Sequence, residues 1–192
     1  MSSAQMPHGE WCVEYVAIGV HAGFSKLGNP VKIERIGQYD VKGMERTKGG
    51  RARLNAFYLG VVEHLCDRLD YMSLQEGKLQ QTYEIFDLQG LSTSLLTLGV
   101  IKFVQDVLIA FSTHYPSSFR KACIINAPPF VGGTWKLVSK VLPASVNAKV
   151  NILDSNYATV LRADLSAEAL KWIASSNTEL AHAPHAPPEP AA

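Results

Sequence analysis

The chain has 192 residues, of which 47% are hydrophobic and 18% are charged. This length and this hydrophobic fraction are typical of one folded domain, and they exclude a chain that is disordered throughout. Charged residues are fewer than the roughly 25% of an average domain, which indicates a large apolar interior or exposed apolar surface. Lys and Arg number 18 and Asp and Glu number 17, so the net charge of +1 gives no bulk attraction to nucleic acid or to an anionic membrane.

In chain order, the hydrophobic pattern alternates strands with long helices. The segment 31–36 alternates apolar and charged side chains, as a half-buried strand does, and 122–125 is nearly all apolar, as a strand buried on both faces is. The predicted elements are a strand over 31–36, a helix over 51–80, a strand over 82–87, a helix over 94–114, a strand over 122–125, a helix over 131–142, a strand over 149–153 and short helices near Tyr157 and Ala167. Strands separated by long helices pair in parallel through right-handed crossovers, so we predict an α/β fold.

The pattern also sets the limits of the folded part. We expect one domain over 13–172 and a disordered tail over 173–192, whose end, AHAPHAPPEPAA, is rich in Pro and Ala. The start of the sequence has neither a basic cluster nor an apolar run, so no secretory signal is expected. The most apolar window, 91–111, is interrupted by Lys102 and Asp106 and is not predicted to span a membrane.

The residues offer little support for catalysis or for metal binding. The sequence has no GxSxG elbow, no GxxxxGK[ST] loop, no HExxH helix and no CxxC pair. Asp87 ends a predicted strand, where a catalytic carboxylate is plausible, but we favour a turn-capping role for it. His64 and His114 are interpreted as helix-surface residues. We therefore predict no enzyme, no metal and no cofactor. The cysteines are interpreted as free thiols of a reducing compartment: Cys12, Cys66 and Cys123.

Four stretches in order resemble the CRAL-TRIO family of lipid-binding and lipid-transfer domains. They are GNPVKIERIG, IFDLQGLSTS, HYPSSFRKACIINAPPFVGGTWKLVSKVL and AKVNIL, and together they span about residues 15–165. The resemblance implies a mixed, largely parallel sheet that floors an apolar lipid pocket and is covered by helices, one of which is a mobile lid. The apolar stripe with Phe130, Trp135 and Val138 suits that lid, and a permanently packed core helix is the alternative.

Other family positions have changed in this sequence. Only a short segment precedes the first matching stretch, so the family's N-terminal helical module is not expected here, and Ser117 stands where phosphatidylinositol-binding members have a Glu. Lys149 is retained from the headgroup set, so the resemblance implies that binding depends on Lys149 if the ligand is anionic. A solvated Lys before a strand is the alternative.

The positions that resemble the phosphatidylcholine site have changed as well. His21 and Lys32 replace tyrosines, Glu84 replaces a hydroxyl, and only Thr82 keeps its hydroxyl. Strand alternation puts Thr82, Glu84 and Phe86 on one face, which faces the ligand if the resemblance holds. We then predict that Lys32 pairs with Glu84, which leaves room for a ligand without a phosphate. The alternative is a strand turned the other way, with Glu84 in solvent or at a helix end.

Two functions remain open at this point. The first is non-catalytic binding of a single hydrophobic lipid, such as a phospholipid, sterol, isoprenoid or fatty acid, and its transfer between membranes. The second is a module with a degenerate pocket that serves as a scaffold or accessory subunit of a larger protein assembly. Both predict a cytoplasmic protein; the first adds transient contact with a membrane surface, the second a protein complex, and neither involves nucleic acid.

Overall fold

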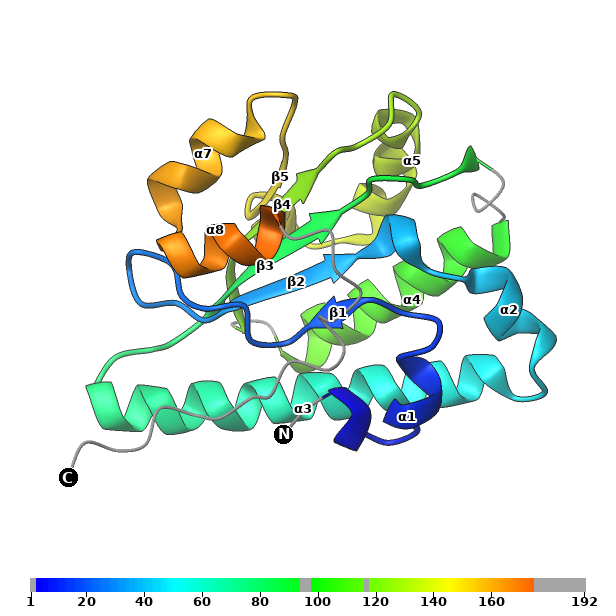
Figure 1. Ribbon diagram of the computed structural model, residues 1–192, viewed down its shortest axis with the longest axis horizontal. Coiled ribbons are helices and arrows are strands. Elements are labelled where there is room, and N and C mark those ends of the chain that lie inside the picture. The colour runs from blue at the N-terminus through cyan, green and yellow to red at the C-terminus, as the bar shows by residue number, and fades with distance from the viewer. Residues whose placement is uncertain (1–2, 94–97, 116–117, 175–192) are drawn as a thin grey trace.

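A five-stranded sheet forms the centre of the molecule (Figure 1). The computed structural model describes residues 3–93, 98–115 and 118–174. Spatial strand order follows chain order: β1 (Ile18–Gly19), β2 (Val31–Arg35), β3 (Thr82–Asp87), β4 (Phe119–Ile125) and β5 (Val150–Ile152). β1 is antiparallel to β2, and every later pair is parallel. The register sets Lys32 of β2 opposite Glu84 of β3, and Glu84 opposite Ala122 of β4.

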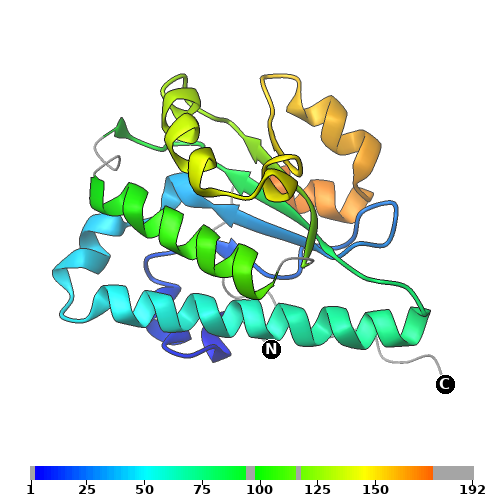
Figure 2. The same ribbon diagram turned by 180° about the vertical axis from the view of Figure 1, so that it is seen from behind.

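Helices cover both faces of the sheet. Their bounds are η1 (Ser3–Gln5), α1 (Gly9–Cys12), η2 (Ile36–Gln38), α2 (Val41–Arg46), α3 (Gly50–Glu76), α4 (Leu98–His114), α5 (Val131–Val138), η4 (Ser139–Val141), α6 (Ala144–Asn147), α7 (Tyr157–Asp164) and α8 (Ala167–Ala174). Helices α7 and α8 lie in front of the sheet in Figure 1, whereas α4 and α5 lie in front of it when the molecule is seen from behind in Figure 2. The long helix α3 runs along the β1 side, where it shares a buried cluster with β1 and the N-terminal helix α1.

The ends of α3 follow from two glycines. Gly49 caps its N-terminus at φ 76° and Gly77 caps its C-terminus at φ 63°. Both angles lie in the left-handed region, which glycine adopts without the steric penalty of a Cβ. These glycines therefore fix the length of the longest helix, within four residues of the prediction at its C-terminal end.

The structure confirms the predicted α/β class and the order of strands and helices. The predicted helix over 131–142 is divided into α5 and the 3-10 helix η4. Helix α8 ends at Ala174, two residues past the expected domain end, and the rest of the expected tail lies outside the described residues, as do positions 94–97 of the predicted helix over 94–114.

The burial of β2 differs from its prediction. All five residues of β2 are buried, so β2 is not the half-buried strand that its alternating pattern indicated. The reason is that its charged side chains find partners inside the protein. Lys32 and Glu34 form ion pairs on one face, and Arg35 donates to the Trp172 carbonyl at the end of α8.

Candidate functional site

The strands present two chemically different faces. On one face, Tyr83 and Ile85 of β3 pack in a buried cluster with Leu161 of α7. On the other face, Phe86 packs against two buried clusters that include residues of α5 and β4. The predicted alternation of β3 is therefore correct, and the face with Thr82, Glu84 and Phe86 lies beneath helices rather than in solvent.

The predicted pair of Lys32 and Glu84 is present on this face. The Lys32 Nζ lies 2.6 Å from the Glu84 Oε2, and the exposed fractions of the two residues are 8% and 5%. The Thr82 hydroxyl donates to the other oxygen of Glu84, at 2.8 Å. These contacts exclude the alternative in which Glu84 meets solvent or a helix end.

Sequence reasoning missed the second carboxylate of this cluster. Glu34, two residues after Lys32 on the same face of β2, forms a second ion pair with the Lys32 ammonium. Burial lowers the pKa of Lys32, but the Glu34 and Glu84 carboxylates more than offset it, so that the pKa lies above the usual value. The i, i+2 spacing on a strand was the available signal, because it places both side chains on one face.

Two tyrosines complete the cluster, which we call the charged cluster: Lys32, Glu34, Tyr39, Tyr58, Thr82 and Glu84. The Tyr39 and Tyr58 hydroxyls lie 2.9 and 3.0 Å from the Glu34 Oε2 and 2.8 Å from each other. Burial and the Glu34 charge raise the pKa of both phenols well above the usual value. Tyr39 follows η2 and Tyr58 lies on α3, so no short sequence pattern connects them with Glu34.

The predicted lid residues pack on the same face of the sheet. Val138 is buried in one hydrophobic cluster with Ala122 of β4, and Trp135 packs against this cluster. Trp135 and Phe130 both pack against a second, neighbouring hydrophobic cluster. Gly132 and Gly133 in the first turn of α5 are exposed, and a Cβ added at either would have no neighbour within 4 Å. Packing therefore does not require glycine there, although glycine weakens a helix.

The two remaining predicted residues, Lys149 and His21, contact groups outside the charged cluster. The Lys149 ammonium donates to the Phe119 carbonyl at 2.9 Å and lies 5.0 Å from the centre of the Phe119 ring. His21 Nδ1 lies 2.9 Å from an Arg68 guanidinium nitrogen, and His21 Nε2 lies 3.2 Å from His64 Nε2. Because a guanidinium only donates, His21 Nδ1 is the acceptor, and His21 Nε2 then donates to His64.

This contact corrects the interpretation of His64. His64 is half-buried on the side of α3 that meets the segment after β1, rather than exposed on the helix surface. Burial lowers the pKa of His64, and the Arg68 charge lowers it further. His114 is exposed at the end of α4, as predicted.

Asp87 has the capping role that we favoured. Its Oδ1 accepts from the Gln89 backbone N–H at 2.9 Å and from the Asn126 side chain at 2.8 Å.

Within the described residues, no group of three or more His, Cys, Asp or Glu side chains could hold a metal ion. All three cysteines are free, two of them buried and one half-buried.

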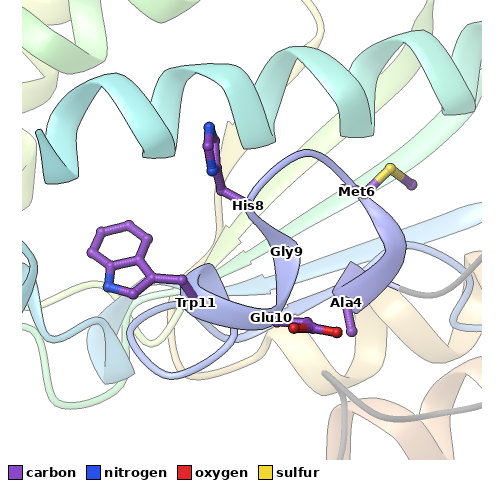
Figure 3. Close-up of a pocket in the computed structure, with 6 residues that line it drawn as sticks. All are labelled: Ala4, Met6, His8, Gly9, Glu10 and Trp11. Atoms are coloured by element: carbon purple, nitrogen blue, oxygen red, sulfur yellow. The ribbon is translucent and has the colours of Figure 1, made fainter.

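A pocket of about 290 Å³ lies at the N-terminal turn. It is lined by Ala4, Met6, His8, Gly9, Glu10 and Trp11. In Figure 3, all six come from one short segment, with His8 directed toward α3 and Glu10 directed away from it. The imidazole and the carboxylate do not converge, and the pocket contains none of the predicted site residues.

Within the residues that the structure describes, no helix is long and apolar enough to cross a bilayer. Comparison with protein families matches residues 15–171 to the CRAL/TRIO domain. A phosphatidylinositol/phosphatidylcholine transfer protein of Arabidopsis thaliana, SFH7, is 26% identical over 157 residues, which cover 80% of this chain and 28% of that protein.

Two further relatives are named cytosolic factors. The SEC14 cytosolic factor of Candida glabrata is 29% identical over 149 residues, covering 76% of this chain and 48% of the relative. The corresponding protein of Schizosaccharomyces pombe is 28% identical over 145 residues, covering 74% and 50%. The chain thus spans half or less of the length of these relatives. Among solved structures, the crystal structure of Sfh5 matches with a TM-score of 0.64 and 18% identity, over 83% of this chain and 55% of that one.

Proposed function

Since this chain belongs to the CRAL/TRIO domain family, we propose that it binds one hydrophobic lipid, without catalysis, on the sheet face that carries the charged cluster. The relatives named as transfer proteins support lipid as the ligand class. The apolar side chains around Phe86 and Trp135 support this face as its location, because lipid sites are lined mainly by such side chains.

The observation that carries the proposal furthest is the buried pair of Lys32 and Glu84. In family members that hold phosphatidylcholine, the resemblance implies a tyrosine and a hydroxyl at these two positions. Here a buried salt bridge between Lys32 and Glu84 stands at these two positions instead. The ligand is therefore a lipid without a phosphate, such as a sterol, an isoprenoid or a fatty acid.

Native mass spectrometry of the full chain expressed in cells tests this function. We expect a complex with one lipid molecule, and lipid analysis of the released ligand should identify a molecule without phosphate. A bound phospholipid would contradict the proposed ligand class, and a mass without any ligand would contradict the function.

Membrane contact through α5 is part of the same proposal. Between Asp106 and Asp154 the sequence has no acidic residue, although the whole chain is nearly neutral. Leu137 and Val141 are 51% and 41% exposed in this stretch, and the exposed lysines at 136 and 140 flank them. Exposed apolar side chains among cations are suited to the surface of an anionic bilayer.

Vesicle sedimentation tests this contact. We expect the protein to sediment with vesicles of phosphatidylserine and phosphatidylcholine, and with pure phosphatidylcholine much less. Lys136→Gln/Lys140→Gln should reduce that sedimentation, whereas the matched change on α2 and its flank, Lys42→Gln/Lys48→Gln, should not. Equal losses in the two variants would contradict a role for this particular face. We propose accordingly that the protein works in the cytoplasm, at membrane surfaces.

A scaffold role is the second candidate, and one observation favours it. Val138, Leu142 and Val146 of the segment after β4 are buried directly against the sheet, so this segment packs as core in the structure. A protein that is isolated without lipid but with a stable partner subunit would support the scaffold role.

A further inference from the structure

The charged cluster contains more negative than positive charge. Lys32 contributes one positive charge, and Glu34 and Glu84 contribute two negative charges, all in residues that are 8% exposed or less. In the part of the chain that the structure describes, Lys32 is the cation that forms ion pairs with both carboxylates. Lys149 lies two strands away from Glu84, beside β5, and its ammonium is held by the Phe119 carbonyl. The cluster as a whole is therefore anionic.

An ionised ligand would meet this excess charge. A carboxylate or phosphate placed beside the charged cluster would add a third negative charge next to one ammonium. Repulsion between like charges is strong where water is excluded, because the local dielectric constant is low. The Lys32 ammonium, which would otherwise attract such a ligand, is already paired twice.

The hydrogen-bonding groups of the cluster instead suit a hydroxyl. An ammonium has three N–H donors, and the Lys32 ion pairs use two of them. Each carboxylate oxygen has two lone pairs, and Glu84 accepts one bond at each oxygen, from Lys32 and from Thr82. A hydroxyl can accept from the remaining ammonium N–H and donate to a carboxylate, whereas a carboxylate ligand can only accept.

Resting on the proposed lipid-binding function, we propose that the charged cluster selects a lipid whose polar end is an uncharged hydroxyl over one whose polar end is an anion. Glu34 and Glu84 are then specificity-determining residues for the same site. Among the ligand classes above, this favours sterols and isoprenoid alcohols and rejects fatty acids.

Two probes that share one hydrocarbon chain test this selectivity. The full chain is incubated with equal amounts of oleyl alcohol and oleate, and native mass spectrometry resolves the two complexes by mass. We expect oleyl alcohol to be preferred by about tenfold or more, which corresponds to about 1.4 kcal/mol. Equal binding or a preference for oleate would overturn the inference and leave lipid binding intact. Binding of neither probe would overturn the proposed function, and the inference with it.

Two variants assign the preference to the cluster. Glu84→Gln and Glu34→Gln each remove one negative charge while keeping an acceptor oxygen, so each should reduce the preference for oleyl alcohol by about tenfold. The control is Glu168→Gln, which removes the same charge from an exposed residue of α8 on the opposite side of the sheet. A preference that stays unchanged in both cluster variants, with circular dichroism showing native folding, would overturn the role of these carboxylates.

Discussion

The two faces of the sheet are built from alternate residues of the same strands, yet their chemistry differs. Beneath α7 and α8, the central positions are apolar: Val31, Ile33, Tyr83, Ile85, Cys123 and Ile125. On the other face, the positions of β2 and β3 hold the charged and polar side chains of the charged cluster: Lys32, Glu34, Thr82 and Glu84. Buried ion pairs contribute less to stability than apolar packing of similar volume. The apolar face therefore serves mainly the stability of the fold. The charged side chains of the other face must be retained for a reason other than stability.

The substitution with the largest expected effect removes the cation of the charged cluster. Lys32→Met should lower the free energy of unfolding by about 3–5 kcal/mol, because it leaves two carboxylates buried without their cation. Urea unfolding measures this loss. The matched substitution Lys42→Met, at an exposed residue of α2, should change the stability by less than about 0.5 kcal/mol. If Lys32→Met is as stable as the natural protein, the ion pairs of Lys32 with Glu34 and Glu84 do not stabilise the fold.

The second prediction replaces the ion pair with the residue types of phosphatidylcholine-binding family members. The double variant Lys32→Tyr/Glu84→Thr should lose less free energy of unfolding than its two single variants lose together. We expect a difference of about 1–3 kcal/mol, because the double variant removes both charges of the pair. It should also take up phosphatidylcholine from vesicles, which the natural protein should not. Additive single losses, without uptake, would show that the pair does not occupy headgroup space.

The third prediction tests the charged cluster by alkaline pH. The pKa of Lys32 is raised in the folded protein, so its stabilising charge is fully present below its unfolded pKa and is lost as the pH rises through the folded pKa. The raised pKa of Tyr39 and Tyr58 acts in the same direction, because the unfolded phenols ionise first. Stability to urea should therefore fall above about pH 10, by up to about 1.4 kcal/mol per pH unit for each of these three groups. The fall should be shallower in Tyr39→Phe/Tyr58→Phe, and an equal slope would exclude the two phenols as its source.

The smallest effect concerns α5 on the charged face. Gly133→Ala should raise the free energy of unfolding by about 0.5–1 kcal/mol, since the added Cβ meets no neighbour and alanine favours the helix. Gly77→Ala is the contrasting variant and should be destabilising, because Gly77 has a φ of 63°. If α5 moves when lipid enters, Gly133→Ala should also slow lipid uptake in a stopped-flow assay.

The sequence carried different amounts of information about the two faces. Hydrophobic periodicity is a local property, so it located β3, α3 and the order of elements. The resemblance supplied the pairing of Lys32 with Glu84, which are 52 residues apart and which periodicity alone does not connect.

The partners of Glu34 could not be predicted in this way. Tyr39 and Tyr58 approach Glu34 from η2 and α3, and the distance between them depends on how α3 crosses the sheet. The alternating pattern of β2 indicates a half-buried strand although all of β2 is buried, because a pattern of alternating charge does not reveal whether partners lie above it. The contact of His21 with His64 likewise depends on the packing of two separate segments.

The agreement between strand order and chain order has a consequence for biosynthesis. Among the strands of the described residues, none has to insert between two that are already paired, so each can add to a free edge as the chain leaves the ribosome. β2 and β3 meet while the segments that form β4 and α5 are still being made. Lys32 and Glu84 can thus pair in water, before the later helices cover them. A wrong pairing of charges separates readily there, because charges interact weakly in water.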